Sequence, residues 1–230
     1  MSRADLGKEP DEVSAMFDGV ARRYDLLNDL LSLGRTKAWR KVATEVIAPK
    51  PGMRILDIAA GTGSSSRPLA DAGADVIPLD FSKGMLDAGR KRHPDLAFTQ
   101  GDALALDFKE NEFDVTTISF GLRNTSDTSK ALRESFRVLK SGGRMVVVEF
   151  SQPTNKIFRT IYLRYLMRAL PTVARKVSSN PDAYVYLAES ILAWPNQNGL
   201  ADLMKAAGFG NVQWKNLTFG IVAIHTGVKP

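Results

Sequence analysis

A glycine turn lies between two short apolar segments, each of which ends in or near an acid. The first segment contains Asp57 and runs into Gly61-Thr62-Gly63, and the second ends at Asp80. Glycine lets a backbone approach a ligand closely, and a carboxylate at the tip of the second strand can bind both hydroxyls of a ribose. The order of these residues predicts a pocket for a nucleoside.

The turn lacks the marks of the common phosphate-binding loops. A dinucleotide fingerprint would place a third glycine where Ser66 stands, and no Gly-Lys pair of a P-loop follows. A glycine turn without a strong phosphate cradle suits a nucleoside without a pyrophosphate, so the candidate ligand is S-adenosylmethionine (SAM). We expect Asp57 to orient the turn or to meet the amino end of the methionine, and Asp80, with Phe81 beside it, to hold the ribose. The alternative is a plain strand-to-helix turn in which Asp80 caps the helix.

Two further polar positions follow later strands and fit the same pocket. Asp102 comes after the third expected strand, where it can bind the exocyclic amine of adenine while the backbone N–H of Ala103 meets a ring nitrogen. The alternative for Asp102 is a solvated loop carboxylate. Ser119 ends the fourth strand and opens the loop 120–124. Because ligands of open α/β sheets lie beyond the carboxyl ends of the strands, we expect this loop to face the transferable methyl group.

The same loop limits which atoms of a substrate could accept the methyl group. Methyltransferases that act on exocyclic nitrogens commonly carry an Asn/Asp-Pro-Pro-aromatic turn there, whereas this chain has Asn124 but no proline. The sequence contains no cysteine, which excludes a covalent route to a pyrimidine carbon. An oxygen or an electron-rich carbon therefore remains as the acceptor. With no cysteine and only two histidines, we also expect no metal.

The bulk composition is ordinary for a soluble globular protein. The 230 residues are 44% hydrophobic and 24% charged, no apolar run approaches the ~20 residues that span a bilayer, and no secretory signal is visible, so we expect a cytoplasmic protein. The net charge of +6 reflects either a solvated surface or attraction to nucleic acid or an acidic lipid face. Scattered basic residues and the lack of an RNA-binding module argue against nucleic acid.

Strand and helix patterns alternate from 53 to 150, which predicts a doubly wound α/β sheet. The expected strands are 53–58, 75–80, 95–99, 113–119 and 144–150, with helices at 64–72, 83–92 and 127–139. Helical spacing also marks 11–48, 155–193 and 198–207, and strands at 211–217 and 219–226 indicate a closing antiparallel hairpin. We expect one domain over 1–230, with a helical cap (1–50), a SAM-binding core (51–150), a helical substrate lid (151–197) and a C-terminal helix and hairpin (198–230).

Longer motifs extend over nearly the whole chain, from about residue 14 to Pro230. They are Phe17-Asp18-x-Val20-Ala21-x-x-Tyr24-Asp25, Asn28-Asp29-x-Leu31-Ser32, Ser119-Phe120-Gly121-Leu122-Arg123-Asn124, Arg137-Val138-Leu139-Lys140-x-Gly142-Gly143-Arg144, Glu149-Phe150-Ser151, Tyr186-Leu187-Ala188-Glu189-Ser190-Ile191 and Asn216-Leu217-Thr218-x-Gly220-Ile221-Val222-Ala223. On these motifs the chain resembles the ubiquinone/menaquinone biosynthesis C-methyltransferases (the UbiE/MenG family). It departs from the family pattern at Leu27, at Thr36, where a histidine often stands, and at Ser141, where a proline is usual.

The resemblance implies the class I SAM-dependent methyltransferase fold, a Rossmann-like, mostly parallel seven-stranded sheet with an antiparallel last strand and helices on both faces. It also implies methyl transfer from SAM to a ring carbon of a polyprenylated quinol. The residue pattern at 14–34 is more similar to menaquinone-only members of the family, which favours conversion of a demethylmenaquinol to menaquinol. The alternatives are a benzoquinol C-methyltransferase of the ubiquinone pathway, a small-molecule O-methyltransferase and, more remotely, an RNA methyltransferase.

With the resemblance, three residues become candidates for catalysis. A quinol carbon becomes nucleophilic when the neighbouring phenol ionises, and Arg123 is expected to stabilise that phenolate. Asn124 would place the quinol oxygen, and Tyr24 would close over the site. The structural alternatives are a surface ion pair, a turn residue and a packing tyrosine.

Residues 156–177 mix apolar and basic side chains in a helical pattern. A basic amphipathic helix can lie on an anionic bilayer surface, on the inner face of the cell membrane in this case. The alternative is a cover helix that packs on the sheet. A homodimer is left open.

Overall fold

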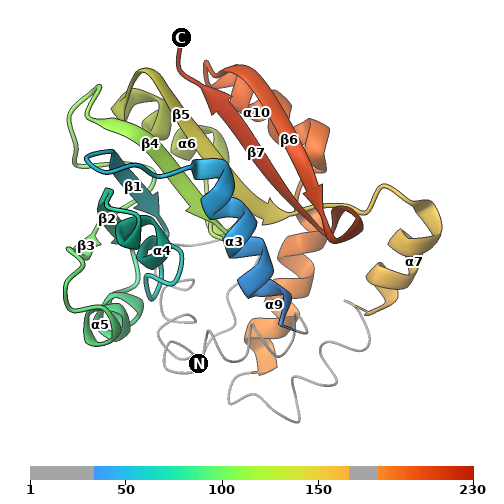
Figure 1. The fold of residues 1–230 in the computed structure, drawn as a ribbon. Coiled ribbons are helices and arrows are strands. Elements are labelled where there is room, and N and C mark those ends of the chain that lie inside the picture. The colour runs from blue at the N-terminus through green and yellow to red at the C-terminus, as the bar shows by residue number, and fades with distance from the viewer. Residues whose placement is uncertain (1–33, 166–180) are drawn as a thin grey trace.

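A seven-stranded sheet forms the centre of the part of the chain that the structure describes, residues 34–165 and 181–230 of a computed structural model (Figure 1). The strands are β1 (Arg54–Ile58), β2 (Asp75–Asp80), β3 (Thr99–Gln100), β4 (Phe113–Ser119), β5 (Leu139–Phe150), β6 (Gly210–Leu217) and β7 (Val222–Val228). Their order is β3-β2-β1-β4-β5-β7-β6. β7 is antiparallel to both of its neighbours, and the other neighbouring pairs are parallel. The predicted sheet is therefore confirmed.

Helices lie on both faces of the sheet (Figure 1). They are α3 (Arg35–Ile47), α4 (Ser66–Asp71), α5 (Lys83–Arg92), α6 (Thr128–Val138), α7 (Lys156–Arg164), α9 (Pro181–Ala193) and α10 (Gln197–Ala206), with short 3₁₀ turns η1 (Leu122–Asn124) and η3 (Thr218–Gly220). Side-chain caps explain where several of them begin: Ser82, Asp127, Asn155 and Asn196 accept hydrogen bonds from first-turn N–H groups. Within the described residues, no helix combines the length and apolarity needed to cross a bilayer.

The central strands are apolar nearly throughout because both of their faces are covered. In β5, Met145 and Val147 belong to the core cluster beneath α6 and α10, whereas Val146 and Val148 belong to the cluster beneath α3 and α4. Successive side chains of a strand point to opposite faces, so a strand buried on both sides shows no polar alternation. The sheet therefore separates two cores that fill both of its faces. This leaves the carboxyl ends of the strands as the place for ligand-binding groups.

Several boundaries differ from the predictions. The expected strand 95–99 is reduced to the two-residue β3, and β5 begins at Leu139 rather than 144, so Ser141 and the glycines after it are part of a strand. A register shift between Phe113 and Val115 lets β4 follow that extension. In the described residues, the helical stretch 155–193 consists of α7 and α9, and 11–48 is represented by α3.

His225 lies inside the sheet because β7 is inserted between β5 and β6. Its side chain is buried, with Nε2 2.9 Å from the Gln197 carbonyl oxygen, and it stacks against Trp214. A carbonyl oxygen only accepts, so Nε2 carries the proton. Nδ1 has no hydrogen-bond partner in the described residues. Burial lowers the pKa of His225, opposed by the hydrogen bond to Gln197.

His225→Gln should make stability less dependent on pH. A histidine whose folded pKa is lowered costs folding free energy as the pH falls through its unfolded pKa of about 6.5, because the unfolded chain binds the proton more readily. Glutamine can donate to the same carbonyl and does not titrate. Urea unfolding should therefore show a smaller loss of free energy from pH 7.5 to pH 5 in the variant, and parallel losses would contradict the assignment.

Candidate functional site

Two strand ends are joined by the carboxylate of Asp80. The backbone N–H of Gly61 donates to Asp80 Oδ2 at 2.7 Å, and the backbone N–H of Ser82 donates to Oδ1 at 2.8 Å. Ser82, rather than Asp80, caps α5 by accepting from Met85. Asp80 therefore joins the glycine turn after β1 to the tip of β2, where Phe81 is 39% exposed beside it.

Asp57 is fully buried at the carboxyl end of β1 and orients the start of α4. Its Oδ2 accepts hydrogen bonds from Ser65 Oγ at 2.8 Å and from Ser66 Oγ at 2.6 Å. Ser66 stands where a dinucleotide-binding loop would have its third glycine. Here the hydroxyl supplies a bond to the acid that no glycine could make.

The other oxygen of Asp57, Oδ1, is buried and has no hydrogen-bond partner in the described residues. Burial raises the pKa of Asp57 from 3.8 to about 6, the two serine hydrogen bonds oppose the shift, and Asp80 adds to it. A buried acceptor without a partner costs free energy, which a ligand donor or a cation would recover. This atom is therefore the strongest single mark of a ligand site in the turn.

The glycine turn has a shape that other residues could not easily adopt. Gly63 has φ +77°, and a Cβ there would lie 2.6 Å from Phe98 Cζ. Gly61 has φ +58°, and Ala59 just before it has φ +53°, which is uncommon for a residue with a side chain. Thr62, between the two glycines, is buried. The backbone thus turns tightly enough for its amides to face a ligand.

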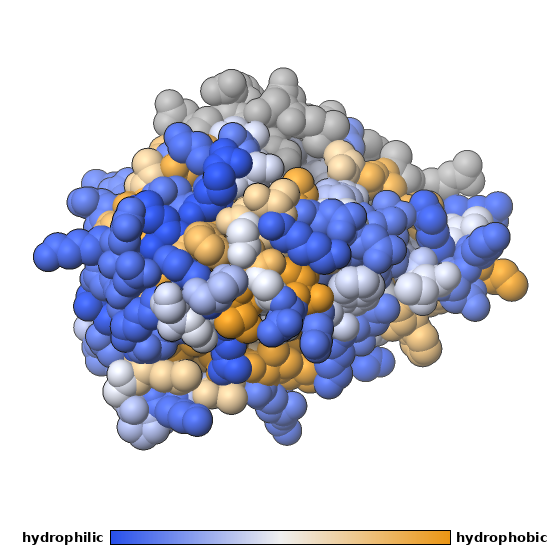
Figure 2. Space-filling model, turned by 90° about the horizontal axis from the view of Figure 1, so that it is seen from above, coloured by the Kyte–Doolittle hydropathy of each residue, from blue (hydrophilic) through white to orange (hydrophobic). Residues whose placement is uncertain are grey.

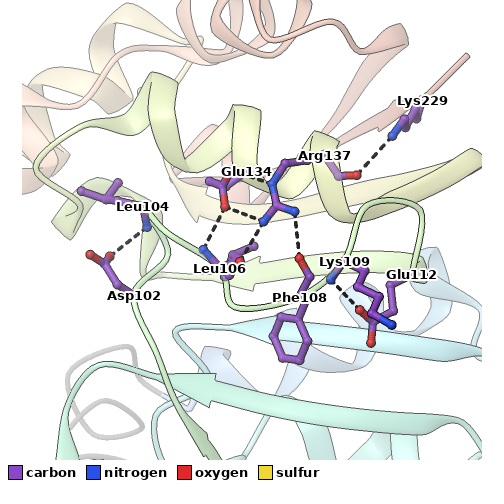
Figure 3. Close-up of polar contacts among 9 residues, drawn as sticks. All are labelled: Asp102, Leu104, Leu106, Phe108, Lys109, Glu112, Glu134, Arg137 and Lys229. Carbon is purple, nitrogen blue, oxygen red and sulfur yellow. Dashed lines mark hydrogen bonds and ion pairs between the residues drawn. The ribbon is translucent and has the colours of Figure 1, made fainter.

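The segment after β3 is held by α6 (Figure 3). Asp102 Oδ1 accepts from the backbone N–H of Leu104 at 2.8 Å. Glu134 accepts from the backbone N–H of Leu106, and Arg137 donates to the carbonyl oxygens of Leu106 and Phe108. Ala103 packs against the core beneath α6. The sequence indicated only a loop here. In the structure, hydrogen bonds from α6 hold the backbone of that loop in place.

The loop after β4 lies directly against the loop after β1. Ser119, partly buried, ends β4, and a Cβ on Gly121 would lie 2.5 Å from the Cβ of Ala59. Phe120 has φ +58° and packs between Trp39 and Phe150, with ring centroids 5.9 and 5.1 Å away. The loop after β1 and the loop 120–124, far apart in sequence, are thus in contact, and their joint role as a ligand site stays a prediction.

Arg123 and Glu149 form a buried ion pair in this site. Arg123 is 4% and Glu149 1% exposed, and Arg123 Nη1 lies 2.8 Å from Glu149 Oε1. Nη1 also donates to the Phe120 carbonyl oxygen at 2.5 Å, and the guanidinium lies 5.1 Å from the centroid of the Phe150 ring. Arg123 Nε is buried without a hydrogen-bond partner in the described residues. Arg123 therefore forms an ion pair, but a buried one rather than the surface pair that sequence reasoning set against catalysis.

Asn124 contacts α9, one of the helices that follow the core. Its Oδ1 accepts from the Tyr186 hydroxyl of α9 at 3.3 Å. Tyr162 of α7 is 8% exposed, burial raises its pKa, and Arg123 is near enough to oppose that shift electrostatically. The segment expected to form the lid thus contacts the loop 120–124 through Tyr186, with Tyr162 near enough to feel the charge of Arg123.

Sequence reasoning missed roles for Glu149, Tyr162 and Tyr186. Glu149 had a signal, since it is the single acid in the apolar strand Met145–Phe150. Tyr162 and Tyr186 could not be separated from packing aromatics by spacing. Tyr24 lies outside the described residues. In residues 34–165 and 181–230, no three potential metal ligands come together.

The glycine turn, the acid at the tip of β2 and the strand order define a class I SAM-dependent methyltransferase. Among solved structures, the fold is similar to a SAM-dependent methyltransferase of Thermotoga maritima (TM-score 0.65, 21% identity, 94% of this chain and 99% of that one covered). It is also similar to Haemonchus contortus phosphoethanolamine N-methyltransferase 2 in complex with SAM (TM-score 0.64, 16% identity, 100% and 60% covered).

The chain belongs to the ubiE/COQ5 methyltransferase family, which it matches over residues 5–229. It is 59% identical to the demethylmenaquinone methyltransferase of Streptomyces avermitilis over 100% of this chain and 99% of that protein. It is 57% identical to the protein of the same name from Renibacterium salmoninarum, over 100% and 97%. The family predicted from the motifs is therefore confirmed.

Asp57→Asn should stabilise the ligand-free protein at high pH. An acid whose folded pKa is raised to about 6 is ionised above that pH at a cost in folding free energy. Asparagine stays neutral and can still accept from the two serines. We expect the variant to be more stable by about 1–3 kcal/mol at pH 8, with the gap closing toward pH 4.

Urea unfolding at several pH values measures this gap. Asp71→Asn is the matched control, because the Asp71 side chain is 65% exposed. A gap for Asp57→Asn that stays constant from pH 8 to pH 4 would refute the role of burial.

Proposed function

We propose that the protein transfers the methyl group of SAM to a ring carbon of a demethylmenaquinol, which yields menaquinol. The observation that carries the proposal is the full-length identity of 59% to a demethylmenaquinone methyltransferase, together with a loop 120–124 that packs on the glycine turn. Among the alternatives, a benzoquinol C-methyltransferase uses the same chemistry and an O-methyltransferase the same cofactor. No observation favours either one.

The residues present fit SAM. Asp57 Oδ1, which has no hydrogen-bond partner in the described residues, suits the methionine ammonium. Asp80 at the tip of β2 suits the ribose, and Asp102 with Ala103 suits adenine. Among residues 34–165 and 181–230, the buried carboxylates Asp57, Asp80 and Glu149 outnumber the buried guanidinium of Arg123. When bound, SAM supplies an electrophilic methyl group to the ring carbon, whose proton then leaves to restore the aromatic quinol.

Arg123 activates the quinol in this proposal. An unperturbed phenol has a pKa of about 10, so ionisation at neutral pH needs a stabilising charge nearby. The Arg123 Nε–H, buried without a described partner, is a donor that a phenolate oxygen would satisfy. Glu149 holds the guanidinium in place, and Asn124, with Tyr186 behind it, positions the quinol oxygen.

The polyprenyl tail of the substrate sets where the enzyme works. We place the reaction at the inner surface of the cell membrane, with residues 151–197 as the lid over the tail and no nucleic acid as partner. Tyr24 would close the site from the cap formed by 1–50. A homodimer stays a prediction.

Turnover with two substrates side by side tests the function. With labelled SAM, reduced demethylmenaquinone should be methylated on its ring carbon at least about tenfold faster than a matched benzoquinol, which corresponds to about 1.4 kcal/mol in the barrier. Mapping the label separates carbon from oxygen. A label on oxygen, or faster turnover of the benzoquinol, would refute the proposal.

The double change Arg123→Gln with Glu149→Gln tests the role of the arginine charge. Changing Arg123 alone would leave Glu149 buried and unpaired at a cost of about 3–5 kcal/mol, so the pair is neutralised together. We expect the double variant to fold and bind SAM but to lose turnover about 100-fold or more. Arg123→Lys, which keeps a positive charge opposite Glu149, is the control and should retain much more turnover than the double variant. Full activity in the double variant would exclude the role of Arg123.

A further inference from the structure

The turn between β6 and β7 holds an aromatic side chain out in solvent. Phe219 is 76% exposed, and it and Thr218 both have positive φ, +59° and +47°. Such backbone angles are strained for residues with side chains, typically by about 1–2 kcal/mol each. The turn therefore combines two unfavourable features, strain and an exposed phenyl ring.

This turn is held rigidly. Trp39 Nε1 donates to Thr218 Oγ1 at 2.8 Å. A Cβ on Gly220 would lie 3.3 Å from Gln152 O and from the Pro153 Cα, so the chain passes close to the segment before α7. The exposure of Phe219 is thus built into the fold.

Phe219 adjoins the apolar side of α7. Its ring lies 5.3 Å from that of Phe158. Ile157 and Ile161, one helical turn apart on α7, are 76% and 59% exposed. We call Ile157, Ile161 and Phe219 the apolar wedge. In Figure 1, α7 projects from the body beside the β6–β7 turn, and Figure 2 shows apolar and hydrophilic residues adjoining at that edge.

Basic side chains accompany the wedge without any acid. At about 100° per residue, Lys156 and Arg159 lie on a different arc of α7 from the isoleucines, whereas Arg164, seven residues after Ile157, lies beside that residue; all three basic side chains are exposed. The segments 151–165 and 209–230 contain no Asp or Glu. Exposed isoleucines flanked by basic residues, with no acid in either segment, are the pattern of a helix that lies in a bilayer interface.

We propose that α7 and the β6–β7 turn together insert the apolar wedge into an anionic bilayer, with the basic residues on the lipid headgroups. The proposed polyprenylated substrate explains why the protein would bind a membrane, and only in that respect does the inference rest on the proposed function. A second copy is the weaker occupant, because an isologous contact would bring the same basic residues of both copies together. The proposed membrane surface thus includes the β6–β7 turn, which the helical pattern predicted at 156–177 could not reveal.

Sedimentation of the full chain with vesicles tests the proposal. The probes are vesicles of equal parts phosphatidylglycerol and phosphatidylcholine, and vesicles of phosphatidylcholine alone. Wild type should pellet with the anionic vesicles, less so in high salt. Phe219→Asn should weaken binding about tenfold, because asparagine tolerates the positive φ but does not partition into lipid. Phe219→Leu should restore most of it.

A charge pair of variants provides the matched control. Arg159→Glu on α7 should weaken binding about tenfold or more, whereas Arg133→Glu, exposed on α6, should bind as wild type does. Binding of Phe219→Asn equal to wild type, or equal binding to neutral vesicles, would overturn the proposal. A dimer that high salt strengthens and Phe219→Asn disperses, without vesicle binding, would overturn it in favour of a second copy.

Turnover on a water-soluble, short-chain demethylnaphthoquinol separates this proposal from the proposed function. Phe219→Asn should turn it over at the wild-type rate, since the wedge is outside the site. If wild type binds anionic vesicles but methylates neither the short-chain nor the long-chain quinol, the proposed function is refuted while the proposed membrane surface is supported. Loss of short-chain turnover in Phe219→Asn would instead place Phe219 in the site and count against the wedge.

Discussion

Buried charge at the carboxyl ends of the strands is the constraint on which the rest of the structure depends. In the described residues, the buried carboxylates and guanidinium are Asp57, Asp80, Arg123 and Glu149, and all lie at or just beyond the carboxyl ends of strands. Burying an ion is costly unless partners compensate. The serines at the start of α4, the amides of Gly61 and Ser82, and the Arg123–Glu149 pair provide those partners, so the loops must fold around them.

The parallel topology explains why these charges can share an edge. Neighbouring parallel strands end on the same side, so the loops after β1, β2 and β4 meet there. The contact of Gly121 with Ala59 and the bond from Gly61 to Asp80 bring the three loops into direct contact. Nucleoside and acceptor can then be held by a single rigid framework, which is what a methyl transfer in line requires.

The sequence predicted those parts of the site that depend on local order. Glycine turns and strand-end acids follow each other along the chain, so Asp57, Gly61 and Asp80 could be assigned to one pocket. The hydrogen bonds that Ser65 and Ser66 donate to Asp57, the second from the position of the missing third glycine, were not predicted. They depend on side-chain direction, which residue order does not specify.

Long-range pairing set the limit of prediction elsewhere. Arg123 and Glu149 are 26 residues apart, and nothing in their spacing indicates a contact. The same holds for the extension of β5 to Leu139, since Ser141 and two glycines are typical of a turn, and the hydrogen bonds that Gly142 and Gly143 exchange with the distant Lys229 cannot be seen in the sequence. Helix α5 was predicted at its observed bounds because its Ser82 cap and its basic last turn are local.

The insertion of β7 between β5 and β6 has a consequence for biosynthesis. A ribosome releases residues 222–228 after the other strands of the sheet, so β5 stays unpaired on one side while β1 to β4 can already pair, and β6 has no partner until β7 arrives. That side belongs to a run of four apolar residues, Met145–Val148, the kind of open edge that captures other chains. Nascent chains stalled before residue 222 should therefore be the aggregation-prone species in the life of this protein.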